Sequence, residues 1–212
     1  MVLDKKVAEQ TVNFLTQINA IKLNTKNPFT WTSGIKSPVY CDNRLVLSYP
    51  KMREFIADSM TQIIVNKYGN DISIAGVATG AIAVGAMISE RLNVPYAYVR
   101  PEPKGHGLRN QIEGNIEEKS NVVVIEDLIS TGKSSLSAIN ALKSEGISVM
   151  GMLSIFSYNF DSANKKFIDE KVTTNSLADY NTLVEVIESN GSLKNEEITR
   201  LKKWREDPEN WS

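Results

Sequence analysis

The chain of 212 residues contains one cysteine and one histidine, and no long run of apolar residues. A single cysteine, Cys41, excludes an intramolecular disulfide framework and is typical of a reducing cytoplasm. No apolar run approaches the length of a membrane span, and the N-terminus MVLDKKVAEQTVNF carries charges where a secretory signal would be apolar. With 24 basic and 25 acidic residues, no excess charge attracts nucleic acid or an anionic membrane. We therefore expect a cytoplasmic protein without a nucleic-acid or membrane partner.

What the chain does have is a regular alternation of apolar segments and helical patterns, at a length that suits one domain. Residues 1–70 predict two amphipathic helices, the second from Pro50 to Gly69, around loops or short strands at 27–44. Residues 71–160 predict strands at 72–78, 94–99, 122–125 and 149–156, separated by helices and by a long loop at 100–120. Residues 161–212 predict helices near 181–188 and from Asn195. The pattern indicates an α/β fold with a mainly parallel sheet flanked by helices.

Polar or glycine-containing segments follow three of the predicted strands, at the edge where parallel sheets bind ligands. The most informative is VVVIEDLISTGKS, residues 122–134, in which four β-branched residues run into Glu126 and Asp127. Successive N–H groups of the following loop, with a helix N-terminus, suit a phosphate. The two carboxylates would repel that phosphate, so we expect them to accept hydrogen bonds from hydroxyls of a phosphorylated sugar.

Two other interpretations of this segment are weaker. A nucleotide-binding P-loop is excluded because the first glycine of that motif would fall at Asp127, where a carboxylate would repel the phosphates. Alternatively, the two acids cap a helix or solvate the edge of a strand. That would be the favoured interpretation for an isolated pair, but it is less favoured where a buried strand and a loop of hydroxyl and glycine residues adjoin the acids.

The same segment is similar to the phosphoribosyl pyrophosphate (PRPP) signature of type I phosphoribosyltransferases. Four other segments resemble the orotate phosphoribosyltransferase family, in the form common in Gram-positive bacteria: PFTWTSGIKSPVYCDNR, IAGVATGAIAVG, YVRPEPKGHGLRNQIEG and KWREDPENW. The resemblance extends over essentially the whole chain and implies one type I phosphoribosyltransferase domain. A small N-terminal hood within residues 1–70 would then cover the base, beside an α/β core at 71–160 and a C-terminal helical part at 161–212.

The activity that the resemblance implies is transfer of ribose 5-phosphate from PRPP to N1 of orotate. The products would be orotidine 5′-phosphate and pyrophosphate, in de novo pyrimidine biosynthesis. The resemblance also implies Mg²⁺ as a cofactor, held mainly by PRPP and water with no dedicated protein ligands. Finally, it implies a homodimer in which a mobile loop reaches into the active site of the neighbouring subunit.

Individual roles follow from the resemblance as well. Arg100, Lys104 and His106 would contact the pyrophosphate and, with Asp127, carry the catalysis. Ser130 would also touch orotate. The residues expected to bind PRPP are Arg100, Lys104, His106, Thr79, Gly80, Glu126, Asp127, Leu128, Ile129, Ser130, Thr131, Gly132, Lys133 and Ser134.

Some positions leave alternatives open. Lys133 stands where relatives often have glycine, and it could contact a phosphate or face solvent; we favour solvent. The orotate carboxylate would need a cation or several backbone donors, and spacing selects none among Lys36, Arg44 and Arg109. Arg44 is better interpreted as a residue that fixes its own loop or a dimer contact.

Three further residues, Trp31, Trp204 and Trp211, are interpreted as packing residues rather than platforms for a base. Three other functions compete with the leading one, and the last of them, a purely structural module, would leave the acidic strand end unexplained. The first is transfer to a purine or to another pyrimidine, which the base-covering N-terminal segment disfavours. The second is a PRPP-sensing regulator that binds DNA, which the absence of a basic recognition helix disfavours.

Overall fold

A six-stranded sheet forms the centre of the computed structural model, which describes residues 1–31, 33–102 and 111–211. The strand order is β10-β9-β8-β5-β6-β7. Neighbouring strands are parallel except β6 and β7, which are antiparallel. The strands are β5 (Ser73–Val77), β6 (Tyr96–Val99), β7 (Ile112–Gly114), β8 (Asn121–Ile129), β9 (Ser148–Ser157) and β10 (Thr174–Asp179).

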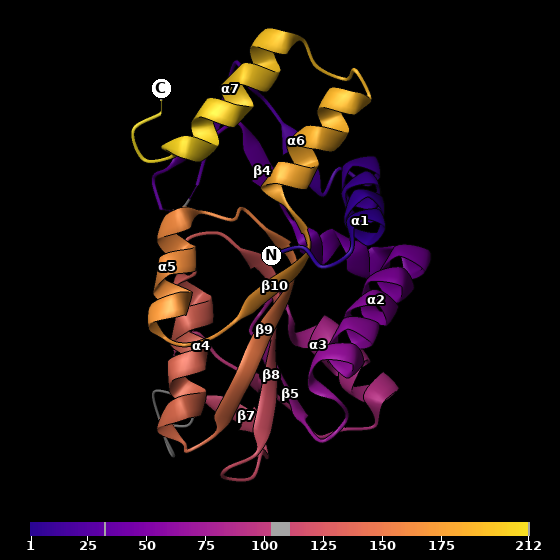
Figure 1. Ribbon diagram of the computed structural model, residues 1–212, viewed down its shortest axis with the longest axis vertical. Coiled ribbons are helices and arrows are strands. Elements are labelled where there is room, and N and C mark those ends of the chain that lie inside the picture. Colours follow the sequence, from indigo (N-terminus) through magenta and orange to yellow (C-terminus); the bar gives the residue numbers. More distant parts are fainter. Residues whose placement is uncertain (32, 103–110, 212) are drawn as a thin grey trace.

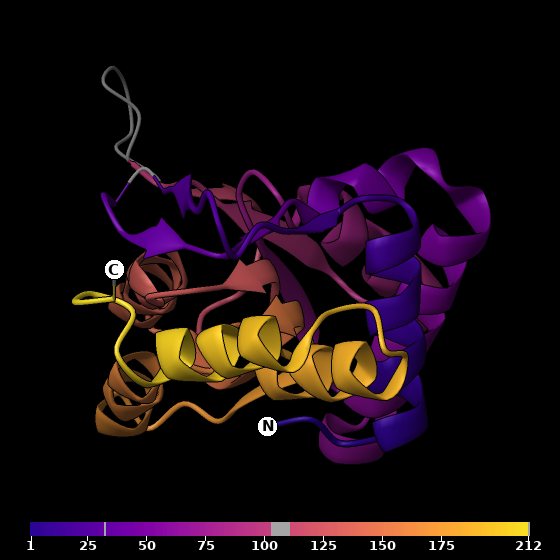
Figure 2. The ribbon, with the colours of Figure 1, turned by 90° about the horizontal axis from the view of Figure 1, so that it is seen from above.

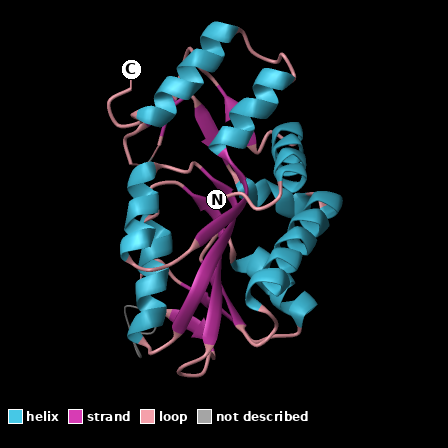
Figure 3. Cartoon of the chain, in the orientation of Figure 1, coloured by secondary structure: helices cyan, strands magenta, loops and turns pink. Residues whose placement is uncertain are grey.

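Helices cover both faces of this sheet (Figures 1 and 3). On one side lie α2 (Pro50–Tyr68) and α3 (Ile82–Leu92), and on the other α4 (Lys133–Ser144) and α5 (Asp161–Asp169). The helix α1 (Lys5–Gln17) packs beside α6 (Tyr180–Ser189), as seen from above in Figure 2. Together with α7 (Asn195–Glu206), α6 lies beyond the carboxyl ends of the strands. The predicted α/β class, with a mainly parallel sheet, is confirmed.

The middle of the sheet is apolar on both faces because helices cover each of them. Residues 122–125 of β8 have no solvent exposure, and neither do Ile74 and Ala75 of the neighbouring β5. The run of four β-branched residues therefore signals a central parallel strand. Its position directs the polar residues that follow to the carboxyl edge of the sheet.

The structure differs from the predicted elements in three places. The strand β8 does not end at Ile125 but continues to Ile129, because β9 pairs with it as far as Ile129 and Ser157. The stretch 100–120, expected to be a loop, contains the short edge strand β7. The part 161–212 contains α5 and β10 besides the two expected helices. The sequence TNSLAD did not predict the strand β10, because polar residues at buried positions hide the apolar pattern of a strand. Asn175 and Ser176 are the buried polar residues there.

The N-terminal part adds two small antiparallel pairs near the carboxyl edge of the large sheet. The strand β1 (Ile21–Leu23) pairs with β4 (Val39–Cys41), and β2 (Phe29–Thr30) pairs with β3 (Lys36–Ser37). A 3₁₀ helix, η1 (Asn43–Ser48), then leads to α2, whose first residue is Pro50 as predicted. Residues 27–44 therefore form loops and short strands, as the sequence indicates.

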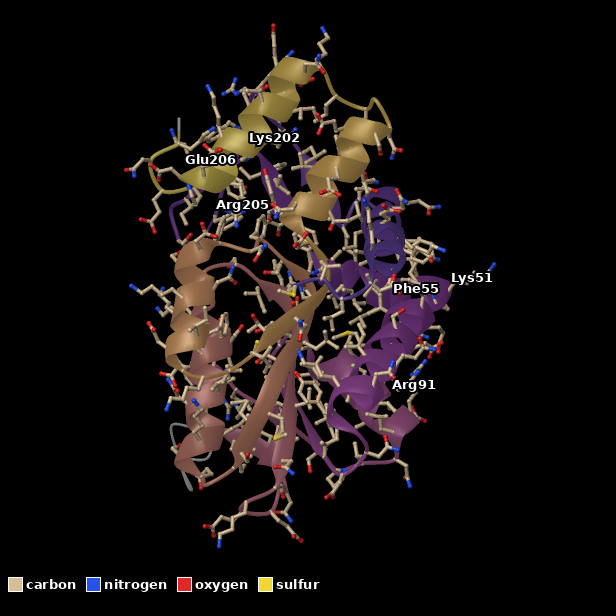
Figure 4. The ribbon with its side chains drawn as sticks, in the orientation of Figure 1. Lys51, Phe55, Arg91, Lys202, Arg205 and Glu206 are labelled. Atoms are coloured by element: carbon tan, nitrogen blue, oxygen red, sulfur yellow. The ribbon has the colours of Figure 1, made fainter. Side chains whose placement is uncertain are left out.

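Aromatic side chains pack between this N-terminal part and the core. The Trp204 ring on α7 is fully buried, and its Nε1 donates a hydrogen bond of 2.8 Å to the Lys36 carbonyl. The Trp31 ring lies 4.7 Å from the Tyr158 ring and 5.8 Å from that of Trp204, centroid to centroid. Nearby, Arg205 extends from α7 (Figure 4) and contacts Asp161 at the start of α5, at 3.1 Å. Trp31 and Trp204 thus both pack against other aromatic rings in the structure.

We expect Trp204→Ala to lower the free energy of unfolding by about 3–5 kcal/mol, because it removes a large buried ring and leaves a cavity. Urea denaturation followed by circular dichroism measures the loss. Trp211, which is partly exposed and lies 5.5 Å from the Arg200 guanidinium, is the matched control. Trp211→Ala should cost about 1 kcal/mol or less. Equal losses in the two variants would contradict the role given to Trp204.

Candidate active site

A pocket of about 560 Å³ opens where β8 ends, between the N-terminal strands and the first turn of α4. It combines an aromatic wall with a rim of hydroxyl groups. This is the edge of a parallel sheet at which ligands bind. The pocket is lined by Thr30, Trp31, Ser33, Tyr40, Cys41, Leu128, Ser130, Thr131, Lys133, Ser134 and Tyr158.

A larger groove, of about 780 Å³, lies beside η1, α2 and α3. The arginine side chains that line it already bind other groups of the protein. The Arg91 guanidinium, labelled in Figure 4, contacts the Asp58 carboxylate at 2.7 Å, and Arg53 donates to the Leu47 carbonyl at 2.8 Å. The smaller pocket is therefore the better candidate for chemistry.

The loop from Ser130 to the start of α4 has the geometry of an anion site. Gly132 adopts φ +77°, in the left-handed region, and a Cβ there would lie 3.1 Å from the Phe167 ring. No side chain caps α4, so the N–H groups of its first turn stay open to a ligand. Ser130 and Thr131 are partly exposed, whereas Lys133 and Ser134 are exposed at the rim. Lys133 thus faces solvent and also borders the pocket.

Asp127 and Gly80 are brought together from two different strand ends. A Cβ built on Gly80 would lie 2.2–2.3 Å from the Asp127 carboxylate, so only glycine allows this approach. Gly80 belongs to the turn after β5, in which the Ala78–Thr79 peptide is cis and Thr79 is exposed. The structure therefore places the Thr79–Gly80 turn beside the Asp127 carboxylate.

Glu126 does not share the environment of Asp127, because adjacent residues of a strand point to opposite faces. The Glu126 side chain is buried, with 4% exposure. Its Oε2 accepts a hydrogen bond of 2.9 Å from the Ser135 hydroxyl, and its Oε1 accepts one of 3.1 Å from the Asp127 N–H. Burial, and next the charge of Asp127, raise the pKa of Glu126 well above its usual range. The structure thus buries Glu126, which was expected to face one sugar together with Asp127, while the two carboxyl groups still interact.

Leu128 and Ile129 were expected in the phosphate loop, but both belong to β8. Leu128 borders the pocket, whereas Ile129 is buried with 4% exposure. The carbonyl of Ile129 accepts a hydrogen bond of 2.9 Å from the N–H of Tyr158. The loop proper therefore begins at Ser130.

Asn43 also lies beside Asp127, although no motif in the sequence singles it out. Its side chain is buried, with 1% exposure, and its Nδ2 donates a hydrogen bond of 2.7 Å to the Asp127 carbonyl. These residues are 84 positions apart in the sequence. No motif indicates such a long-range contact, which depends on how η1 packs against β8.

The cations of the expected site are only partly described. Arg100 is partly buried at the end of β6, and its Nη1 lies 3.5 Å from the Glu113 carboxylate. Lys104, His106 and Arg109 lie outside the described residues. Arg44 forms a double hydrogen bond with Asp42, at 2.7 and 3.0 Å, and so fixes its own loop. Lys36 is exposed in β3.

Within residues 1–31, 33–102 and 111–211, no three His, Cys, Asp or Glu side chains form a group that could hold a metal ion. In the same part of the chain, no helix is both long and apolar enough to cross a membrane. The partly exposed Asp127 carboxylate is a hard oxygen donor of the kind Mg²⁺ accepts, alongside phosphate oxygens and water.

A phosphate loop and a carboxylate at the carboxyl edge of this sheet define a type I phosphoribosyltransferase, and the sequence profile of a phosphoribosyl transferase domain matches residues 46–187. Orotate phosphoribosyltransferase of Phocaeicola vulgatus is 47% identical over 99% of this chain and 97% of its own. That of Bacillus cytotoxicus is 44% identical over 94% and 95%. The chain belongs to the orotate phosphoribosyltransferase family.

Solved structures agree with this assignment. Orotate phosphoribosyltransferase from Aeropyrum pernix superposes with a TM-score of 0.74 at 30% identity, over 86% of this chain and 99% of that one. UMP synthase of Leishmania donovani superposes with a TM-score of 0.77 at 24% identity, over 95% of this chain and 43% of that one. The second likeness shows the fold alone.

The buried Glu126 predicts a specific dependence of stability on pH. Because its folded-state pKa is raised, its contribution to stability is fully present below the unfolded-state pKa, about 4.3, and is lost as pH rises through the folded-state pKa. We expect Glu126→Gln to have a higher melting temperature than the parent at about pH 8, and a smaller advantage at about pH 5. Calorimetry across this range measures the difference. Glu117→Gln, at an exposed position, controls for the loss of one charge. Parallel profiles for Glu126→Gln and the parent would contradict the prediction.

Proposed function

We propose that the protein transfers ribose 5-phosphate from PRPP to N1 of orotate, releasing orotidine 5′-phosphate and pyrophosphate in pyrimidine biosynthesis. One observation carries the proposal: an open phosphate loop, a carboxylate and an aromatic pocket meet at one edge of the sheet, in a chain of the orotate phosphoribosyltransferase family. A phosphorylated sugar requires the first two features, and a planar base suits the third. We expect the reaction to take place in the cytoplasm, consistent with the lone buried thiol of Cys41.

The ribose 5-phosphate would occupy the loop from Ser130 to Ser134. There the open N–H groups of α4 and the hydroxyls of Ser130, Thr131 and Ser134 donate hydrogen bonds to the phosphate oxygens. The Asp127 carboxylate accepts hydrogen bonds from the ribose hydroxyls and stabilises positive charge that develops at the anomeric carbon. Glu126 supports this arrangement from beneath, through Ser135 and the Asp127 N–H. Ser130, beside the aromatic wall, would also touch orotate.

The pyrophosphate would leave across the Thr79–Gly80 turn toward Arg100, Lys104 and His106. Negative charge grows on the leaving group, so these cations contribute most in the transition state. His106 can donate a proton to a leaving oxygen, as histidine side chains do in general acid catalysis. Mg²⁺, held by PRPP oxygens and water with Asp127 close by, would supply charge neutralisation of the pyrophosphate.

The direct experiment is a spectrophotometric assay with purified protein, Mg²⁺ and PRPP, presenting orotate, uracil, adenine and hypoxanthine in turn. We expect orotate absorbance to fall only when both Mg²⁺ and PRPP are present, with pyrophosphate released in equal amount. Reaction with another base alone would reassign the substrate. PRPP binding without any reaction would favour a regulator and contradict the proposal.

We further propose a homodimer in which the loop between β6 and β7 reaches the neighbour's active site, as the family resemblance implies. Lys104→Ala and Asp127→Asn should each lower turnover strongly, the first with little loss of PRPP affinity because its contact strengthens as pyrophosphate departs. If the loop is shared, mixing the two variants should restore about a quarter of parental activity, because hybrid dimers form half of a random mixture and contain one intact site of two. Lys119→Ala, exposed and remote from the pocket, is the control for a lost surface charge. A mixture no more active than its components would contradict the shared loop.

A further inference from the structure

The strand β8 extends beyond its neighbour β5. Pairing between them ends at Gly76 and Ile125, whereas β9 accompanies β8 to Ile129. From Glu126 onward, β8 therefore has a sheet partner on one side only, at the point where Asp127 must be held. Contacts other than pairing with β5 must therefore hold this part of β8.

Asn43 provides one such contact. Its Nδ2 donates to the Asp127 carbonyl at 2.7 Å, and the side chain is buried with 1% exposure. The Asn43 amide thus holds the backbone of β8 in the part that extends beyond β5. Because Asn43 begins η1, the same bond ties the N-terminal segment to the acidic strand.

Cys41 fixes the orientation of this amide. Its Sγ–H donates to Asn43 Oδ1 at 3.1 Å. A flipped amide would set Oδ1 against the Asp127 carbonyl, acceptor against acceptor, and would set its NH₂ against the thiol. Burial, together with the charges of Asp127 and Asp42, raises the pKa of the Cys41 thiol, so the thiol keeps the proton that it donates.

The side chain of Asp127 has little freedom on the other side. Its carboxylate lies where a Cβ of Gly80 would be, 2.2–2.3 Å from that position. The Asn43 hydrogen bond holds the backbone of Asp127, and the turn after β5 contacts its carboxylate. A small shift of β8 would therefore move the carboxylate relative to Asn43 and to that turn. The position of Asp127 thus depends on the Asn43 bond.

We propose that Asn43 is a positioning residue of the active site, whose amide holds the backbone of Asp127 so that its carboxylate meets the ribose hydroxyls of PRPP. This inference rests on the proposed function. It adds a direct connection between the N-terminal segment and the sugar site, made by Cys41 and Asn43.

The test is a double-mutant cycle on PRPP affinity, measured by isothermal titration calorimetry in the presence of Mg²⁺. We expect Asn43→Ala to weaken PRPP binding about tenfold, the effect of losing one good hydrogen bond. In an Asp127→Asn background, the same change should weaken binding by less than about twofold, because its effect passes through the Asp127 carboxylate. If Asn43→Ala does not fold, Asn43→Ser provides the same comparison, since its shorter side chain cannot span the distance.

Asn175→Ala is the matched control, because Asn175 is also buried, with 4% exposure, and its amide donates at 3.1 Å to the Met1 carbonyl, away from the pocket. It should lower the melting temperature and leave PRPP affinity unchanged. Parental affinity in the Asn43 variant, or an equal loss in both backgrounds, would overturn the inference while leaving the proposed function intact. A parent protein that binds no PRPP would overturn both.

Discussion

The site depends on one feature of strand pairing, namely that β8 extends past β5 while it remains paired with β9. The unpaired side of the projecting end gives the turn after β5 room to approach Asp127. In the same part of β8, the Asp127 carbonyl accepts the hydrogen bond from Asn43. The carboxyl edge of this sheet is therefore stepped, and the turn after β5, Asp127 and Asn43 come together at the step.

The same projecting end explains why two adjacent carboxylates behave differently. Strand alternation turns Glu126 inward to Ser135 and leaves Asp127 partly exposed beside the Gly80 turn. Inside, the cost of burying a charge favours the protonated form of Glu126, with the Ser135 hydroxyl and the Asp127 N–H as partners. Asp127 is less buried than Glu126. One carboxyl group thus supports the fold beneath the strand end, and the other stays open to solvent.

The sequence predicted much of this arrangement because its strongest patterns are local. Four β-branched residues identify a central strand, Pro50 and Gly69 bound α2, and the STGKS segment indicates an anion loop. The elements that escaped prediction depend on tertiary contacts. The polar strand β10 is buried only because α1, α2 and the chain terminus cover it. The end of β8 is set by β9, which no pattern within β8 reveals. Asn43 resembles any loop asparagine until η1 is packed against Asp127.

Like Asp127, the N-terminal segment is held in place by contacts with the core. Trp31, Tyr158 and Trp204 pack edge to face over the pocket side of that segment, and the Trp204 indole N–H donates to the Lys36 carbonyl. The Tyr158 hydroxyl donates to the Val39 carbonyl at 3.3 Å. The aromatic cluster and the Asn43 bond thus both join this segment to the core. Since they lie on either side of β4 in the sequence, the strand that carries Tyr40 and Cys41 is held at both ends. A base bound against that strand would therefore sit at a set position relative to the sugar, which a reaction between the two requires.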